Sequence, residues 1–290
     1  MSFLPLVLVV GAAFVHALWN LLAKRAASAG PAFVLASTLI ACLAYAPWVG
    51  WLLAGGGAGW NAAMLAATLA SGLVHLGYSL CLQRGYQVAD FSVVYPVARG
   101  SGPLLSASFA LLFLGEPATA GGIIGLLTVV AGIGLISTQG ELAAFRRPEG
   151  LRGVRWGGLT GALIATYTVI DAYAVRHLGL APVLLDWFAN LVRLVLLAPV
   201  ALARPARFAA TMRGHWRLAV GVGLLSPLSY ILVLFALDMG APVSVVAPMR
   251  EMSMMLGALL GMVVLRERVG VWRLIGCAVL IAGVVLLGTA

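Results

Sequence analysis

Long apolar runs separated by short polar connectors dominate the pattern of this 290-residue chain. A helix that crosses a bilayer needs about 20 mostly apolar residues. The apolar runs here are continuous and do not alternate as membrane strands do. The pattern predicts ten spans at residues 4–23, 31–53, 61–83, 91–114, 119–137, 155–175, 182–203, 217–237, 243–265 and 271–288. We therefore expect an all-α polytopic membrane protein with no separate soluble domain.

The composition agrees with this pattern. Apolar residues make up 62% of the chain and charged residues only 9%, against about 45–50% and about 25% in soluble domains. The net charge of +9 raises the question of nucleic-acid binding, but the basic residues lie in connectors without interleaved aromatics, so we expect no nucleic-acid partner. The three cysteines lie inside apolar runs and predict no disulfide framework. No metal or cofactor site is expected, and the first apolar run is expected to be a span.

The lysines and arginines predict the orientation. Fourteen of the 18 basic residues lie in the odd-numbered connectors or within the first three residues of the spans that follow them, and the even-numbered connectors carry only Arg176. Basic connectors face the cytoplasm in membrane proteins. The prediction is a multi-pass protein of a bacterial-type inner membrane with both termini outside the cytoplasm.

The two halves of the chain resemble each other. The segment ADFSVVYP (89–96) corresponds to APVSVVAP (241–248) at a shift of 152 residues, and the shift becomes 151 after the proline. Corresponding residues include Tyr78 and Tyr230, Arg99 and Arg250, Glu116 and Glu267, Gly125 and Gly276, and Gly132 and Gly283. We expect a first five-helix repeat at 1–140, a connector at 141–153 and a second repeat at 154–290. The glycines on the fifth and tenth spans predict close helix packing.

Five spans per repeat have a consequence for orientation. An odd number means that the second repeat enters the membrane inverted with respect to the first. Inverted repeats are typical of alternating-access transporters, whose sites lie near the midplane between the halves. The alternative is that duplication only enlarged a membrane scaffold.

Several motifs resemble those of EamA-domain transporters of the drug/metabolite transporter superfamily. They are HALWN at 16–20 with Lys24, LVRLVLLAP around Arg193, the paired SVVYP and SVVAP, and the paired LGEPATAGGIIG and LRERVGVWRLIG. The resemblance implies ten helices around a central cavity and secondary transport, often efflux of amino acids, other metabolites or drugs. One departure is that Arg193 aligns with Ala41, where many relatives carry arginine in both halves.

Polar residues inside the spans form three helical stripes, because residues at i, i+3, i+4 and i+7 share one face. The stripes are His16–Trp19–Asn20, Ser71–His75–Tyr78 and Asp186–Asn190–Arg193. We expect the first stripe to line a cavity. For Ser71 and His75 we expect hydrogen bonds between helices.

Arg99 and Arg250 form the strongest candidate pair, because each follows a proline that opens the helix. From their spans we expect opposite depths in the membrane. Glu251 is not expected to share a face with Arg250, and its predicted partner is Arg193 or Arg99. The alternative is a structural buried ion pair.

These residues predict a secondary transporter of a small amino acid-like, zwitterionic or anionic metabolite, which acts by alternating access as an exporter. The predicted substrate-binding residues are His16, Trp19, Asn20, Tyr78, Tyr95, Arg99, Arg193, Tyr230, Arg250 and Glu251. Glu251 and Asp171 are candidates for proton coupling.

The alternative is a flippase or carrier for a lipid-linked or amphiphilic molecule. No motif of a membrane enzyme is present, so no catalytic residue is expected. Measured flux that never saturates would indicate a channel. The expected partners are the bilayer, the substrate and protons, and the expected state is a monomer or weak dimer.

Overall fold

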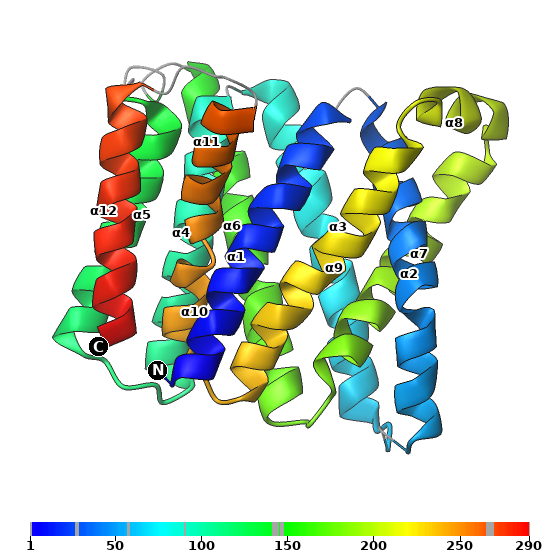
Figure 1. Ribbon diagram of the computed structural model, residues 1–290, viewed down its shortest axis with the longest axis horizontal. Coiled ribbons are helices and arrows are strands. Elements are labelled where there is room, and N and C mark those ends of the chain that lie inside the picture. Colours follow the sequence, from blue (N-terminus) through cyan, green and yellow to red (C-terminus); the bar gives the residue numbers. More distant parts are fainter. Residues whose placement is uncertain are drawn as a thin grey trace.

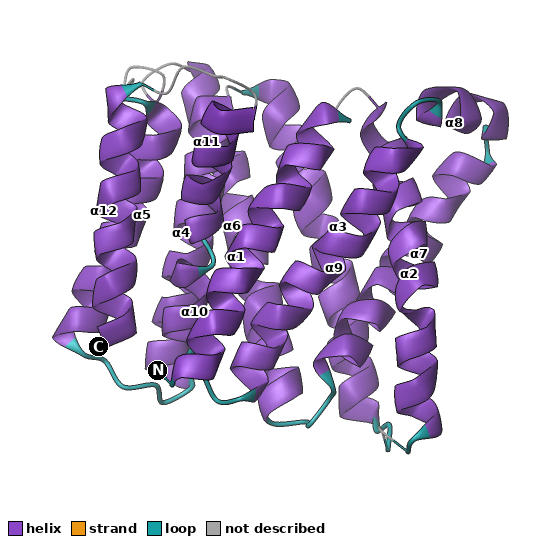
Figure 2. Ribbon diagram, viewed as in Figure 1, coloured by secondary structure: helices purple, strands orange, loops and turns teal. Residues whose placement is uncertain are grey.

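The computed structural model is a bundle of helices that run between two ends of the molecule (Figure 1). It describes residues 2–26, 29–56, 59–89, 91–140, 145, 148–264 and 270–289. The helices are α1 (Phe3–Arg25), α2 (Gly30–Ala54), α3 (Ala62–Val88), α4 (Phe91–Phe113), α5 (Ala120–Thr138), α6 (Pro148–Arg176), α7 (Pro182–Leu202), α8 (Pro205–Met212), α9 (Trp216–Asp238), α10 (Val243–Met249), α11 (Met252–Val264) and α12 (Val271–Thr289). No strand occurs in these ranges (Figure 2), so the all-α prediction is confirmed.

Eight helices of the described chain are long and apolar enough to cross a membrane, namely α1, α2, α3, α5, α6, α7, α9 and α12. The other two predicted spans correspond to α4 and to the pair α10–α11. Helix α4 carries Arg99 and two prolines, and the ninth predicted span is divided into two shorter helices. The membrane class is therefore established, and the count of ten spans stays a prediction.

Two local features differ from the sequence prediction. The ninth span is not one helix, because α10 ends at Met249 and α11 begins at Met252, which places a turn halfway between the two ends of the bundle (Figure 2). Proline has no backbone N–H and disturbs a helix locally, and Pro248 is the second-last residue of α10. By contrast, α4 continues through Pro96 and Pro103. The second feature is α8, a short helix inside the predicted polar connector between the seventh and eighth spans.

Side-chain caps fix where two of the spans begin. The Asn61 side chain accepts a hydrogen bond from the Met64 backbone N–H at 2.9 Å, and the Thr119 hydroxyl accepts one from Gly122 at 3.0 Å. Asparagine and threonine are favoured at such positions because their oxygens satisfy donors that the helix leaves open. The starts of α3 and α5 are therefore encoded locally.

The contacts between helices follow the correspondence of the two halves. Helix α1 packs along α9, as α6 packs along α3, and α4 packs along α6, as α11 packs along α1. The first helices of the two halves also run in opposite directions, since α1 starts at the lower end of Figure 1 and α6 starts at the upper end. Contacts and directions of this kind are what an inverted repeat would produce.

Glycines bring α5 and α12 into close contact. A Cβ at Gly132 would lie 2.7 Å from the backbone nitrogen of Leu280, and one at Gly283 would lie 2.7 Å from that of Val129. Gly125 and Gly276 leave similarly little space. Small residues allow helix backbones to approach in membranes, so the predicted close packing is confirmed.

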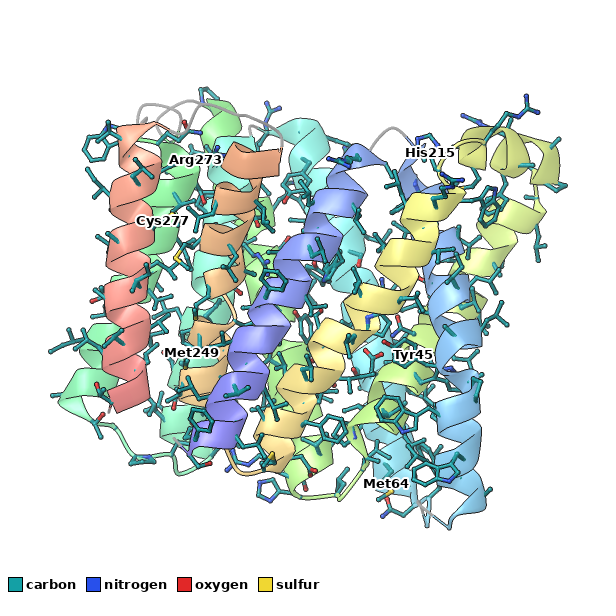
Figure 3. The ribbon with its side chains drawn as sticks, in the orientation of Figure 1. Tyr45, Met64, His215, Met249, Arg273 and Cys277 are labelled. Carbon is teal, nitrogen blue, oxygen red and sulfur yellow. The ribbon has the colours of Figure 1, made fainter. Side chains whose placement is uncertain are left out.

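The two ends of the bundle differ in charge. Helices α1, α3, α5, α7 and α11 end at the upper end of Figure 1, and both termini lie at the lower end. Arg273 and His215 mark the upper end in Figure 3, and Met64 marks the lower end. We call the upper end the basic end, because the sequence has most of its basic residues in the segments that follow these five helices. Of the predicted connector 141–153, residues 148–153 already belong to α6, and 141–144, 146 and 147 lie outside the described residues, as does Glu267.

Candidate functional site

The turn between α10 and α11 forms the charged centre of the bundle. Arg250 and Glu251 occupy this turn, and both are buried, with 4% and 0% of their surface exposed. Backbone bonds here join Glu251 to Pro248 and Met254 to Glu251, three residues apart, instead of the four of an α-helix. Broken helices at membrane depth are tolerated where they line a cavity and often build substrate sites.

Glu251 lies between two arginines. The Arg99 Nε and Nη1 atoms are each 3.4 Å from a Glu251 carboxylate oxygen, and Arg250 Nε is 3.8 Å from Oε1. Arg99 Nη2 also lies 3.0 Å from His16 Nε2 on α1. The guanidinium of Arg99 lies over the Tyr95 ring, 5.7 Å from its centroid. The prediction of Arg99 as a partner of Glu251 is thus confirmed.

Two expectations about this cluster are wrong. Glu251 does contact Arg250, because both residues lie in a turn, where the 100° spacing of helix neighbours does not apply. The charged groups of Arg99 and Arg250 are also not separated in depth, since both long side chains reach the same carboxylate. The sequence could not show this convergence, because it depends on the break in the ninth span.

A cavity of about 310 Å³ lies beside the charged cluster. Residues of α1, α2, α3, α6, α7 and α9 line it together with Arg99 and Arg250, and we call it the chamber. The lining of α1, α2, α3 and α9 comes from the parts of these helices between the middle of the bundle and the basic end (Figure 1). The chamber therefore extends from the centre toward the basic end, while Val9, Val49 and Met64 of the main core cluster lie toward the other end.

Aromatic rings form one wall of the chamber. His75 stacks on Tyr167 with ring centroids 3.9 Å apart and meets Tyr230 edge-on at 5.5 Å. Tyr78 contacts Tyr167 at 5.9 Å. Trp19 Nε1 on α1 donates to the Ser229 hydroxyl on α9 at 3.2 Å. Such a wall offers apolar ring faces together with hydroxyl groups at their edges.

Asp171 lies behind this wall. It is fully buried on α6, accepts a hydrogen bond from the Tyr230 hydroxyl, and does not itself line the chamber. Its Oδ1 atom makes no hydrogen bond within the described chain. A buried carboxyl oxygen without a partner is uncommon in native proteins and calls for an explanation.

Helix α7 supplies a second ionic wall. Asp186, Asn190 and Arg193 all line the chamber, as the helical stripe predicts. Asn190 donates to the Asp186 carboxylate at 3.0 Å and accepts from Arg193 Nη1 at 3.3 Å. The corresponding residues of the first half also line the chamber, but they are Val34, Thr38 and Ala41. The two halves thus contribute equivalent positions with unlike chemistry.

Some donors of the chamber arginines have no partner. Within the described residues, Arg193 Nε and Arg250 Nη2 are buried without a hydrogen bond. Among the described residues, no carboxylate oxygen lies within 4 Å of a guanidinium nitrogen of Arg193. Leaving a buried charged donor unpaired costs more than leaving a neutral one unpaired. Donors of this kind at the edge of a cavity suit an anionic ligand group, which arginine can bind bidentately.

The predicted site residues divide into three groups. Those that line the chamber are His16, Trp19, Tyr78, Arg99, Arg193, Tyr230 and Arg250. Glu251, Asp171 and Tyr95 do not line it, but each contacts a residue that does. Asn20 is exposed, and its amide donates to the His16 carbonyl of its own helix at 2.7 Å, so it lies outside the chamber.

The sequence analysis also missed members of the site. His75 was expected to join helices, but its Nδ1 bonds to Ser71 of its own helix and its ring faces the chamber. Tyr167 and Ser229 were not singled out. Tyr167 could have been found from its position one helical turn before Asp171, on a polar face of α6.

A second charged cluster, which we call the latch, lies at the end opposite the basic end. Glu116 follows α4, and its carboxylate accepts hydrogen bonds from the backbone N–H groups of Val243 at 2.7 Å and Ser244 at 2.9 Å, where α10 begins. Arg176, at the end of α6, donates to the same carboxylate at 3.1 Å. A carboxylate suits the positive end of a helix, and this one connects the two halves of the chain.

The fold and the chamber define a multi-pass helical membrane protein with an ionic cavity inside it. Residues 151–289 match the model of the EamA-like transporter family. The second half of the chain is therefore an EamA domain of the drug/metabolite transporter superfamily, and the resemblance seen in the motifs is confirmed. Members of this family are transporters, so the coarse function is transport across a membrane.

Comparison with solved structures supports the fold alone. One crystal structure is similar with a TM-score of 0.72 and 19% sequence identity, and the alignment covers 96% of this chain and 95% of that chain. Comparison with curated proteins gives no match. The shared fold thus extends over both halves, but it names no substrate.

Proposed function

We propose that this protein is a secondary transporter that carries a small zwitterionic or anionic, amino acid-like metabolite by alternating access. The observation that supports it best is that two arginines, Arg193 and Arg250, line a central cavity, and that each also has a buried donor without a hydrogen bond within the described residues, Arg193 Nε and Arg250 Nη2. An organic carboxylate would satisfy both with charge-assisted hydrogen bonds.

The size of the chamber favours a small substrate. Ligand pockets usually measure about 300–1,000 Å³, and a volume of about 310 Å³ lies at the lower limit of this range. An amino acid-like molecule fits this volume better than a lipid-linked one, which favours the metabolite transporter over the alternative flippase. Asp186 on the ionic wall would bind an ammonium group, and the aromatic wall would contact the side chain of the substrate.

Alternating access follows from the proposed inverted repeat. The chamber extends toward the basic end, and the latch joins the halves at the other end. The positive-inside rule would place the basic end in the cytoplasm and both termini outside. In that orientation the structure corresponds to a state that loads substrate from the cytoplasm, which supports export. Release on the other side would require the latch to open.

Asp171 is the better candidate for proton coupling. Glu251 is held between two arginines, whereas no cation of the described chain lies within 4 Å of Asp171. Its contact with Tyr230 connects it to the chamber wall, so a proton on Asp171 would alter a residue that lines the site. Uptake into proteoliposomes that is unchanged by collapsing an imposed pH gradient would rule out this coupling.

The decisive experiment is a thermal-shift screen of the purified protein against amino acids, amines, organic acids and phosphonates. A ligand that binds only the folded state raises the melting temperature. We expect stabilisation by a carboxylate-bearing compound, and its loss in Arg193→Gln. Arg84→Gln, which removes a charge outside the chamber, is the control. A compound that stabilises the wild type and Arg193→Gln equally would exclude Arg193 from the site, and saturable flux in proteoliposomes would separate a transporter from a channel.

A further inference from the structure

A second cavity, separate from the chamber, lies at the basic end. It measures about 480 Å³ and is formed by the start of α2, the end of α7 and the short helix α8. In Figure 1, α8 lies across the upper end of the bundle beside these two helices. The chamber and this cavity share no lining residue.

The lining combines cationic and apolar groups. Arg204 and Arg207 are exposed side chains at the cavity, and no described carboxylate lies within 4 Å of either. The Thr211 hydroxyl adds a polar group, while Leu35 and Leu197 provide an apolar surface on the two spanning helices. Two unpaired guanidinium groups beside an apolar groove match an anionic head group that is attached to hydrocarbon.

The position of the cavity also fits the edge of a membrane. Leu202, at the end of α7, is 75% exposed, and Trp216, at the start of α9, is 45% exposed. Tryptophan is enriched where hydrocarbon meets the head groups. An apolar span end and an interfacial tryptophan on either side of α8 place Arg204 and Arg207 at head-group depth.

We propose that this cavity binds an anionic phospholipid. The phosphate would contact Arg204 and Arg207, with Thr211 as a further donor, and the acyl chains would follow Leu35 and Leu197 toward the hydrocarbon. Basic pockets between spanning helices bind such head groups. This site depends on neither the substrate nor the direction of transport, so it stands apart from the proposed function.

The test measures lipid binding to the full-length protein by native mass spectrometry. Phosphatidylglycerol and phosphatidylcholine with identical acyl chains are compared on the wild type, on the double variant Arg204→Gln/Arg207→Gln and on Arg213→Gln/Arg217→Gln. The last variant is the matched control, because it removes the same charge from exposed residues at the same end that do not line the cavity.

We expect the wild type to prefer phosphatidylglycerol and the first variant to bind it about 30-fold more weakly. Each arginine near an anionic lipid contributes about 1 kcal/mol, and 1.36 kcal/mol is tenfold. The control should change binding less than about threefold. An equal loss in both variants, or equal binding of the two lipids, would overturn the site. Displacement of the lipid by millimolar inorganic phosphate would indicate a free phosphate site instead, and melting temperatures verify that both variants are folded.

Discussion

The latch at Glu116 offers a direct test of how the two halves are held together. Glu116→Ala removes a carboxylate that is 8% exposed and accepts two backbone hydrogen bonds from the start of α10. Val243, which donates one of them, is fully buried, so its N–H would lose its partner without access to water. The Arg176 side chain is 26% exposed, and water would partly replace its ion pair.

These contacts set the size of the expected loss. A hydrogen bond to a charged group contributes about 1.5–3 kcal/mol, and an unsatisfied buried donor costs a similar amount. The lost contacts of Ser244 and Arg176 add little to the loss at Val243. Glu116→Ala should therefore lower the free energy of unfolding by about 2–4 kcal/mol. Glu116→Gln keeps one oxygen acceptor and should cost about half as much. For a chain of this size, about 2 °C per kcal/mol converts the alanine loss to roughly 4–8 °C.

The assay is thermal unfolding of the purified protein, followed by tryptophan fluorescence. Asp238→Asn is the matched control, because Asp238 is an exposed carboxylate at the same end and should change the melting temperature by less than about 1 °C. A double-mutant cycle with Arg176→Gln should show positive coupling. The reasoning fails if Glu116→Ala melts like the wild type, since the carboxylate would then contribute nothing to the start of α10.

Three further predictions address packing and the charged centre. Gly132→Ala should destabilise the protein by about 1–3 kcal/mol, because the new Cβ would meet the backbone of α12. Gly134→Ala is the control, since its Cβ has open space and the change should be neutral or slightly stabilising. The melting temperatures of the two variants check this prediction. Glu251→Gln should cost about 3–5 kcal/mol by leaving two arginines without a countercharge, which unfolding in denaturant would measure. Trp19→Phe should lower stability by about 1 kcal/mol through its lost bond to Ser229, and a Trp19→Phe/Ser229→Ala double mutant should add little beyond the single change.

The sequence was sufficient to predict the class of protein and much of the site. Hydropathy located the eight described helices that are long and apolar enough to cross a membrane, because lipid allows only segments that satisfy their own backbone hydrogen bonds. The repeat identified Tyr78, Tyr230, Arg99 and Arg250 as related residues, and all four line the chamber. Helical periodicity placed Asp186, Asn190 and Arg193 on one face of α7, and this face lines the chamber. Local rules of this kind are visible in a sequence because they depend on spacing alone.

What the sequence did not predict depends on contacts between distant segments. Asn20 shares a helical stripe with His16, yet its amide bonds to its own helix and its side chain is exposed. His75 faces the chamber because Tyr167, from the other half, stacks on its ring. The contact of Glu251 with both arginines depends on the break in the ninth span, after Pro248. The corresponding proline of α4, Pro96, causes no such break. Similar local sequences, which differ by one residue after the proline, therefore adopt different local structures.

The difference between the two halves bears on how the proposed transporter would bind a polar substrate. If the halves were identical, the chamber would present the same groups on both sides and could not orient a molecule with unlike ends. Here Asp186, Asn190 and Arg193 stand on α7, and their counterparts on α2 are Val34, Thr38 and Ala41. In the proposed cycle the halves exchange conformations, but the ionic groups stay on α7. A substrate would therefore keep the same partners in both states, and the exchange would alter only which end of the chamber is open.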